Sequence, residues 1–495
     1  MRAPKPGLTL GVVVVSLVAG VVATGAASAS RTASAAPAQA RPAAVPVTDS
    51  VVVCPSLGAT DPGMSSVVSA SSPGTTGTIE MRSLAVSASA GPMAVLGPAG
   101  GVLRYAAKAG GGTGPVLVHA TGARAAGLTA QVFTRVPAGV RRSIRSAACT
   151  APTGDTWLVG GSTVSGRRDV LYLTNADTSP AVVDVTVYGP AGPLQPGSAQ
   201  GVTVAPRSQT GVAVDALAPG LANVAVHVHA RSGRVAAALQ DVAAVGGTAA
   251  GIDWVPPSVP PSRSFTVTGI PSEQTARHTL LLLAPGQDDA TVRVRFATAD
   301  GLLSPATVNA VDVPAGQLLA INLDKQAPGI ASPYALVIDA DHPVVAGVQT
   351  NEGGHAKLAE FSWAAGSPEV VGPAVVAPWV YRTGSVSTAL QVTAAGSDDV
   401  VVRVTTFAST GTQVGQQEYT VEPGRTLQVA PGSISLGPGS ALVEIPDGAR
   451  VVVGTYTVEN GAHGPLIAGG PLWQTPVRIL QPPAVSDPAV GFPGH

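Results

Sequence analysis

The sequence predicts an all-β protein of tandem immunoglobulin-like β-sandwiches that follow an N-terminal signal or anchor segment. The prediction depends on an internal repeat of about 109 residues, on alternation of Val with polar residues inside each copy, and on an apolar N-terminal run. Gly (59 residues) and Pro (44 residues) are frequent, and the apolar excess lies in Val and Ala. This composition favours many short strands joined by turns.

The first 30 residues decide the predicted compartment. Arg2 and Lys5 precede the apolar run LTLGVVVVSLVAGVVATGA, and the small residues Ala27-Ser28-Ala29 follow it. This order is typical of a secretory signal peptide. Because the apolar run approaches the length that spans a bilayer, an uncleaved membrane anchor is the alternative. Both alternatives predict an extracytoplasmic protein, either secreted or anchored in the cell membrane through its N-terminal segment.

Three copies of the repeat align over most of their length. They begin with the segments LYLTNADTSPAVVDVTVYGPAG, LLLLAPGQDDATVRVRFATADG and LQVTAAGSDDVVVRVTTFASTG, and they end at Trp254, Trp363 and Trp473. Each tryptophan ends its copy where a strand meets a linker, so we expect it to pack against the edge of its own domain or a neighbour. Exposed platforms for sugars are the alternative.

Alternation such as V-D-V-T-V predicts strands that are covered on one face only. About seven such strands in each copy fit a two-sheet sandwich of immunoglobulin type, and a propeller with two blades in each copy is the rival architecture. The predicted division is a signal peptide or membrane anchor (1–30), an Ala/Pro-rich tether (31–50), a degenerate β-domain (51–150), three sandwich repeats (151–256, 257–366 and 367–480) and a disordered tail (481–495).

The two cysteines, Cys54 and Cys149, both belong to the part of the chain that we expect to be exported. An even number of cysteines in an oxidising compartment predicts a disulfide between them. Closing so long a loop would stabilise the fold by roughly 4 to 5 kcal/mol in the chain-entropy model. Two buried free thiols are the alternative.

Charge and motifs exclude several classes of function. Charged residues make up 12% of the chain and the net charge is -1, which argues against a nucleic acid partner. The sequence contains no G-x-S-x-G, H-E-x-x-H or G-x-x-x-x-G-K-[ST] motif, so we predict neither an enzyme nor a cofactor. The pairs Asp288-Asp289 and Asp398-Asp399 each follow a Gly between two strands, which is typical of turns rather than of calcium or acid-base sites.

His227 and His229 alternate along one predicted strand, so both imidazoles project from the same face, as two zinc ligands would. A third ligand is missing from the sequence neighbourhood. The sequence alone therefore assigns no metal site.

A possible binding loop lies before the first strand of the repeat. Trp157, Gly160-Gly161 and Arg167-Arg168 place an aromatic ring, a flexible turn and two charges close together, and binding loops use that combination. A hairpin that closes the sandwich would need the same glycines, which is the structural alternative. The basic cluster of Arg141, Arg142 and Arg145 is expected to lie on a solvated loop or strand edge rather than to bind anionic polymers.

The pattern from Cys149 through TWLVGGS, GRRDVLYLTN and A-V-V-D-V-T-V resembles an actinobacterial family of exported, membrane-tethered envelope proteins of unknown function. The likeness runs loosely from Val51 to Gln481 and departs at Asn175-Ala176, where we would expect Asn-Pro. It implies tandem β-domains on a tether and adds no catalytic residue.

We expect a non-enzymatic extracytoplasmic scaffold or interaction protein of the bacterial cell envelope. Its partner would be an envelope protein or a cell-wall polymer. The alternative is a cell-wall glycan-binding or enzyme-accessory protein that acts through the loop at Trp157.

Overall fold

The computed structural model describes residues 42–56, 63–84, 91–96, 101–107, 114–272, 275–330, 333–352, 360–429, 437–461 and 464–481. The signal or anchor segment, most of the tether and nearly all of the tail lie outside these residues. Two compact units are formed, of which one comprises residues 46–478 and the other the remaining terminal segments. In the terminal unit β1 (Ala43–Pro46) pairs with β36 (Arg478–Gln481). None of the described helices has both the length and the apolar character needed to cross a membrane.

The larger unit consists of four groups of strands, which we call the first to fourth modules. The first contains β2 (Asp49–Cys54), β3 (Ser65–Ser71), β4 (Ile79–Ser83), β5 (Ala94–Leu96), β6 (Leu103–Ala106), β7 (Val116–Thr121), β8 (Thr129–Val136) and β9 (Ser143–Ala148), with the 3-10 turn η1 (Gly122–Ala125). The second contains β10 (Asp155–Val159), β11 (Arg167–Asn175), β12 (Ala181–Gly189), β13 (Gly192–Leu194), β14 (Val202–Val204), β15 (Ser208–Ala213), β16 (Ala225–Ser232), β17 (Ala236–Val245), β18 (Thr248–Val255) and β19 (Pro257–Ser258).

The third module contains β20 (Ser262–Val267), β21 (Arg277–Leu283), β22 (Ala290–Thr298), β23 (Leu302–Leu303), β24 (Val311–Val313), β25 (Leu318–Asn322), β26 (Tyr334–Glu352) and β27 (Glu360–Ser367). The fourth contains β28 (Ala374–Arg382), β29 (Val386–Ala394), β30 (Val400–Ala408), β31 (Gln413–Val421), β32 (Thr426–Val429), β33 (Gly437–Glu444), β34 (Val451–Glu459) and β35 (Leu466–Pro471).

Short helical turns repeat with the same period as the sequence. The second module has η2 (Gly197–Ala199) and the single-turn helix α2 (Val214–Leu217), and the third has η3 (Ala306–Val308) and α3 (Leu323–Gln326). Each turn of the third module begins 109 residues after its counterpart in the second. The repeat therefore extends to the connections between strands.

The strands pair in the same order in every module. The first strand of each module joins one sheet by pairing with a strand from later in that module: β2 with β7, β10 with β16, β20 with β26 and β28 with β33. The other sheet has the orders β6-β3-β8-β9, β15-β11-β17-β18, β25-β21-β26-β27 and β32-β29-β34-β35. All of these pairings are antiparallel.

The prediction of an all-β protein is confirmed, but the immunoglobulin order of the strands is not. In an immunoglobulin constant-type domain the first two strands share a sheet. Here β2 and β3 lie in different sheets, as do β10 and β11. The alternation in the sequence specified which side chains face inward, but it could not specify which strands become neighbours.

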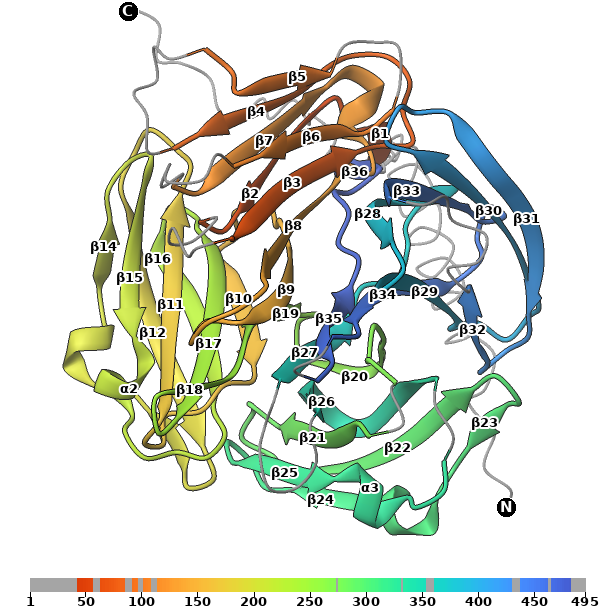
Figure 1. Cartoon of the computed structure of the whole chain (residues 1–495). Helices are drawn as coiled ribbons and strands as arrows, with labels where there is room; N and C mark the ends of the chain where they lie inside the picture. The colour runs from red at the N-terminus through yellow and green to blue at the C-terminus, as the bar shows by residue number, and fades with distance from the viewer. Residues whose placement is uncertain are drawn as a thin grey trace, which may run out of the picture. The chain divides into compact units, whose positions relative to one another are not determined.

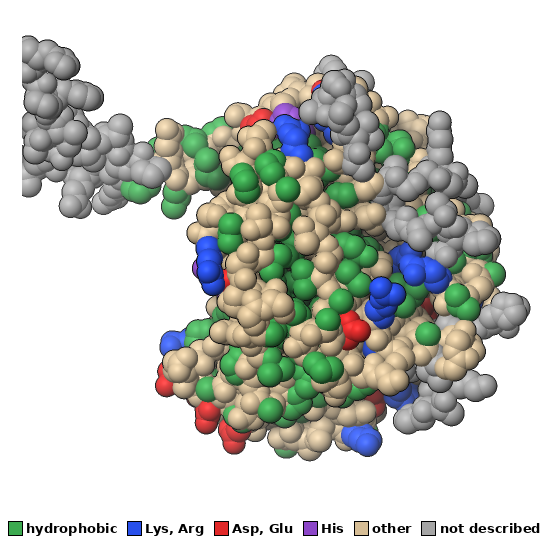
Figure 2. Space-filling model, turned by 90° about the vertical axis from the view of Figure 1, so that its left-hand side faces the viewer, with side chains coloured by type: hydrophobic (Ala, Val, Ile, Leu, Met, Phe, Trp, Pro, Cys, Tyr) green, Lys and Arg blue, Asp and Glu red, His purple; other side chains and the backbone are tan. Residues whose placement is uncertain are grey.

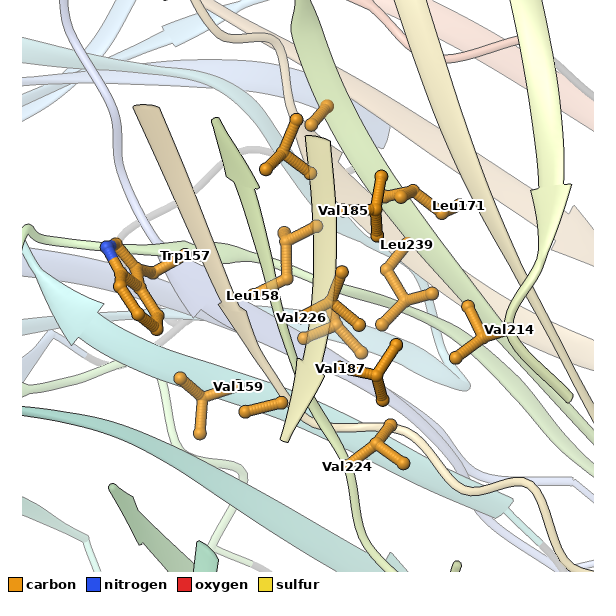
Figure 3. Close-up of a cluster of buried hydrophobic side chains, with 14 of the residues drawn as sticks. Trp157, Leu158, Val159, Leu171, Val185, Val187, Val214, Val224, Val226 and Leu239 are labelled. Carbon is orange, nitrogen blue, oxygen red and sulfur yellow. The ribbon is translucent and has the colours of Figure 1, made fainter. Parts of the chain in front are cut away.

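The two sheets of a module share one apolar core, which the alternation builds. On β12 the side chains of Val183, Val185 and Val187 are buried, whereas Val182 and Asp184 face outward. Figure 3 shows Leu158 pointing into this core, while the neighbouring Trp157 points to the opposite side of β10. Full burial of one such aliphatic side chain contributes about 1.5–3 kcal/mol.

The modules do not form the predicted row of separate domains. Within residues 46–478 the last strand of each module contacts the last strand of the next, in the cycle β9, β18, β27, β35 and back to β9. Figure 1 shows β9, β27 and β35 near the middle of the view, between the four modules. The four modules therefore make a propeller-like ring, because each module has an apolar edge that a neighbour covers.

Polar interactions connect the four central strands. The backbone N–H of Gly469 on β35 donates to Oγ of Ser362 on β27 (2.9 Å), and the backbone N–H of Trp363 on β27 donates to the buried carboxyl of Asp253 on β18 (2.9 Å). Burial raises the pKa of Asp253 well above its ordinary value, while the charge of Arg145 on β9 opposes this rise. Both Asp253 and Arg145 are buried. The centre of the ring is therefore a hydrogen-bonded junction between modules.

The tryptophans that end the first and second copies of the repeat pack between modules, as expected. Trp254 belongs to the core of the first module, and Trp363 belongs to the core of the second. Trp363 is 1% exposed and its indole N–H donates to Asp241 (3.0 Å) on β17. Trp473 differs, because it is only partly buried and lines a groove.

The predicted disulfide is present in the structure. Cys54 at the end of β2 is bonded to Cys149, which directly follows β9, and their Cα atoms are 4.2 Å apart. The bond joins the first and last strands of the first module. It also joins the two sheets of that module, because β2 and β9 belong to different sheets.

Candidate functional site

A groove lies where the first, second and fourth modules meet, and we call it the junction groove. Its volume is about 320 Å³. Its walls come from segments far apart in the sequence: Cys149–Thr150, the start of β10, residues 257–260, and residues 473–476. Tryptophan and proline rings form much of the lining, and among the described lining residues Asp155 is the only charged one. The groove thus offers an apolar surface with one carboxylate.

Trp157 lines this groove, but its position in the structure is not that of an exposed loop residue. It is on β10, its side chain is 6% exposed, and its indole stacks on the imidazole of His227 (centroid distance 3.9 Å, interplanar angle 8°). Tyr188 packs beside the same indole at 5.6 Å. These contacts fix the orientation of the ring at the wall of the groove.

The other residues of the predicted binding loop lie elsewhere. A Cβ atom at Gly160 would come within 2.8 Å of the Trp363 ring, and one at Gly161 would come within 2.1 Å of the Asp169 carboxyl. Gly160 is therefore needed for close packing against the third module, and Gly161 for close packing within the second. The structure does not bring them onto a common surface with Trp157.

Arg167 and Arg168 point in different directions from the start of β11. The side chain of Arg167 is only 10% exposed, and its guanidinium makes an ion pair with Asp241 and lies 4.5 Å from the centroid of the Phe361 ring. Arg168 is exposed. Arg167 therefore stabilises the joint between the second and third modules, whereas Arg168 faces solvent.

Asp169 and Asp241 form a buried pair beside Arg167. They are cross-strand partners on β11 and β17, and neither side chain is exposed. Burial, together with the negative charge of Asp241, raises the pKa of Asp169 to about 10. Asp169 therefore keeps its proton at neutral pH, and Arg167 compensates the charge of Asp241.

Glu360 is a further buried acid at the same joint. Its carboxyl accepts hydrogen bonds from the backbone N–H groups of Ile252 (3.2 Å) and Phe361 (3.1 Å). Burial raises the pKa of Glu360 well above its ordinary value, against these two hydrogen bonds. Perturbed acids often mark active sites, but these carboxyls lie within the packing between modules and do not line the junction groove.

A cluster of three metal-ligand side chains lies at the edge of the junction groove. Asp155 on β10 faces His227 and His229 on β16, and the potential ligand atoms of all three lie within 4.8 Å of one another. Oδ2 of Asp155 is 2.8 Å from Nε2 of His227 and 3.4 Å from Nδ1 of His229. We call this group the Asp-His cluster.

Sequence reasoning found the two histidines but missed Asp155. The carboxylate is 72 residues before His227, and only the pairing of β10 with β16 brings them together. In that pairing Asp155 is opposite His229, and Trp157 is opposite His227. The order of strands could not be derived from alternation, so the third ligand could not be found from the sequence.

A second groove lies between the first and second modules. Its volume is about 520 Å³, and three arginines (Arg82, Arg207 and Arg234) line it together with His119. Arg82 is paired with Glu80, and Arg234 is paired with Asp177. Because those charges are already compensated, this groove offers less free charge than its composition suggests.

The remaining candidates have structural positions. Asp288-Asp289 and Asp398-Asp399 lie in bends between strands, and Oδ1 of Asp289 accepts a hydrogen bond from the backbone of Ala315 (2.8 Å), as turn residues do. Of the predicted basic cluster, Arg145 is buried and the side chain of Arg142 donates to the backbone carbonyl of Gly464. Uncharged side chains dominate the face seen in Figure 2, with few charged ones among them.

Comparison with known proteins gives a family but no activity. No curated protein matches the chain. The crystal structure of Thermotoga maritima 1070 is similar with 19% sequence identity, covering 21% of this chain and 90% of that chain at a TM-score of 0.18. The model of a family of unknown function, DUF5719, matches residues 105–432, which include the whole second and third modules and the whole Asp-His cluster. The chain therefore belongs to the DUF5719 family.

Proposed function

We propose that this protein is a non-enzymatic interaction protein of the bacterial cell envelope, which acts outside the cytoplasm. In this proposal the ring of modules is a rigid scaffold, and the junction groove holds an extended segment of an envelope protein. The observation that carries the proposal is the lining of that groove by rings from two modules, Trp157 and Pro257 of the second and Trp473 after the last strand of the fourth, beside apolar residues of the first.

The chemistry of the groove supports an apolar, extended partner. Proline and tryptophan rings offer flat apolar surfaces, which recognise extended and proline-containing segments in other proteins. The backbone of the groove is fixed by strand pairing, since β19 pairs with β10 and Thr129 pairs with Gln474. A partner would therefore meet a preformed surface and would not have to order a loop.

Two features support the location outside the cytoplasm. The apolar run near the N-terminus has the pattern of a secretory signal or anchor. The disulfide between Cys54 and Cys149 is a bond that persists in oxidising compartments. The actinobacterial source and the attachment to the cell membrane belong to the same proposal.

A second candidate is a glycan-binding or enzyme-accessory role in the same groove. It is favoured by the two tryptophans that line the groove, Trp157 and Trp473, since aromatic rings stack on sugars. The stacking of Trp157 on His227 covers one of its faces. A sugar would therefore stack on the partly exposed Trp473 rather than on the covered face of Trp157.

Site-specific crosslinking tests the first proposal. We would place a photoreactive amino acid at Pro476, which is exposed and lines the groove, and irradiate the protein with the membrane and cell-wall protein fraction. The matched control carries the same amino acid at Leu303, which is 45% exposed on the third module. We expect a crosslinked envelope protein from the variant at 476 only. Identical products from both positions, or none, would contradict a partner in the groove.

Purified cell wall freed of protein tests the second candidate. If glycan is the ligand, the wild-type chain is retained by this material, and Trp473→Ala loses retention while its melting temperature stays close to that of the wild type. Trp157→Ala should also lose retention, but with a lower melting temperature, because its ring is buried. Retention that neither substitution changes would exclude the groove as a glycan site.

A further inference from the structure

We propose that the Asp-His cluster is a binding site for Zn²⁺ or a similar divalent transition-metal ion. The ligands are one carboxylate oxygen of Asp155 and one ring nitrogen from each of His227 and His229. Two imidazoles and one carboxylate are a ligand set that Zn²⁺ accepts, and a fourth coordination position would remain open to water. The proposal does not depend on the function proposed for the junction groove.

The distances within the cluster are close to those of a metal site. Tetrahedral Zn²⁺ with bonds near 2 Å holds its ligand atoms about 3.3 Å apart. The two Asp155–histidine distances, 2.8 Å and 3.4 Å, bracket this value. All pairs of ligand atoms lie within 4.8 Å, so small rotations of side chains would complete the geometry. His229 has room for such a rotation, because its side chain is 58% exposed.

The surroundings orient one ligand and leave the others accessible. Trp157 stacks on His227 and fixes the plane of the imidazole, whose Nε2 faces Asp155. This arrangement resembles the support that outer groups give to metal ligands, which reduces the entropy lost on binding. Asp155 is 49% exposed, so an ion can reach the cluster from solvent.

The neighbouring carboxylate of Asp184 is not available as a metal ligand. Asp184 on β12 is the other cross-strand partner of His229. One of its oxygens accepts a hydrogen bond from the backbone of Gly201 (2.8 Å), and the other accepts from Arg231 (2.6 Å). The hydrogen bond from Arg231 lowers the pKa of Asp184. Both oxygens are thus engaged, which leaves Asp155 as the carboxylate that can ligate.

The first module has an equivalent pair of side chains, Asp49 and His119, but lacks the second histidine. Asp49 on β2 lies 2.7 Å from Nε2 of His119 on β7, as Asp155 lies near His227. The residue opposite Asp49 is Thr121, where the second module has His229. The residue opposite His119 is Val51, where the second module has Trp157. The chain thus contains its own control, a two-ligand pair in the equivalent place.

Equilibrium dialysis of the metal-free chain against Zn²⁺ tests the proposal. We expect one Zn²⁺ per chain for the wild type and the same affinity for His119→Gln. His229→Gln, His227→Gln and Asp155→Asn should each weaken binding at least tenfold. With Co²⁺ in place of Zn²⁺, we expect the visible absorption of a tetrahedral nitrogen and oxygen site, lost in the same three variants.

The variants separate loss of a ligand from loss of structure. His229 and Asp155 are exposed, so their substitution should leave the near-ultraviolet circular dichroism unchanged. No Zn²⁺ bound to the wild type would overturn the proposal. So would an affinity that His229→Gln and Asp155→Asn leave unchanged, or one that falls equally in His119→Gln.

Discussion

The joint between the second and third modules differs in kind from the joint that closes the ring between the fourth and first. In the former, Trp363 enters the core of the second module and donates hydrogen bonds to two buried acids, from its indole N–H to Asp241 (3.0 Å) and from its backbone N–H to Asp253 (2.9 Å). Arg167 and Asp169 complete this network, which we call the buried joint. Nearly all of its polar groups are removed from solvent.

The closing joint depends on aromatic stacking and on a partly exposed ion pair. The ring of Phe133 stacks on Trp379 with centroids 5.3 Å apart, and the indole N–H of Trp379 has no hydrogen-bond partner among the described residues. Arg135 makes two hydrogen bonds to Glu459, with side chains that are 37% and 10% exposed.

This difference suggests how the ring is held together. A buried charged network is strongly destabilised when one member is removed, because its partners cannot regain solvent. A stack and a partly solvated ion pair tolerate the loss of one member much better. We therefore expect the modules that follow one another in sequence to be joined firmly, and the closing joint to be the one that opens more easily.

Replacing the central tryptophan of each joint should give the largest effect. Trp363→Ala removes a fully buried ring and a hydrogen bond to a buried acid, and we expect the free energy of unfolding to fall by about 5 kcal/mol. Trp379→Ala should cost about 3 kcal/mol, since its N–H has no partner to leave unsatisfied. Urea unfolding of both variants measures the difference. Equal losses would show that the two joints are equivalent.

Removing the arginine of each joint should give the next largest contrast. Arg167→Met leaves Asp241 buried without its cation, and we expect a loss of about 3 kcal/mol in the free energy of unfolding. Arg135→Met should cost about 1 kcal/mol, because its pair with Glu459 is partly solvated. Adding Asp241→Asn to Arg167→Met should recover part of the loss. No recovery in this double variant would mean that packing, not charge, explains the effect of Arg167.

The buried joint should also make stability depend on pH. The pKa of Asp169 is about 10 in the folded chain, against about 4 for an unfolded Asp. Between these values the folded state keeps a proton that the unfolded state releases, so stability is greatest at low pH within this range and falls as the pH rises. We expect the free energy of unfolding to fall by about 1 kcal/mol or more between about pH 6 and pH 8.

The substitution Asp169→Asn should reduce this slope, because it removes the group that holds the proton. Arg135→Met, in the closing joint, should keep the wild-type slope. Urea unfolding at several pH values measures both. A slope that Asp169→Asn leaves unchanged would assign the pH dependence to other acids, such as Asp253 and Glu360.

Added salt should change the free energy of unfolding least, and it should act on the closing joint. Raising NaCl to about 1 M screens the partly exposed pair of Arg135 and Glu459, and we expect a loss of about 0.5 kcal/mol that Arg135→Met does not show. The contribution of the ion pair between Arg167 and Asp241 should not change with NaCl concentration, because solvent ions do not reach it. A salt effect shared equally by Arg135→Met would mean that the screened charges lie elsewhere.

Much of the local structure could be predicted from the sequence. Alternation along segments such as AVVDVTVYG specifies strands whose Val side chains face a core, because successive side chains point to opposite faces. The 109-residue period specified repeated modules, and the number and position of the cysteines specified the bond between Cys54 and Cys149. These features depend on neighbours in sequence or on a single pair of residues.

Only the tertiary structure decided which strands are neighbours and which surfaces the modules share. The pairing of β10 with β16 brings Asp155 to His227 and His229, and the packing of the third module against the second places the Phe361 ring against Arg167, which the sequence suggested for a binding loop. Alternation fixes which side of a strand faces inward but carries no information about its partner strand. The closed ring and the Asp-His cluster both depend on such pairings between residues distant in the chain.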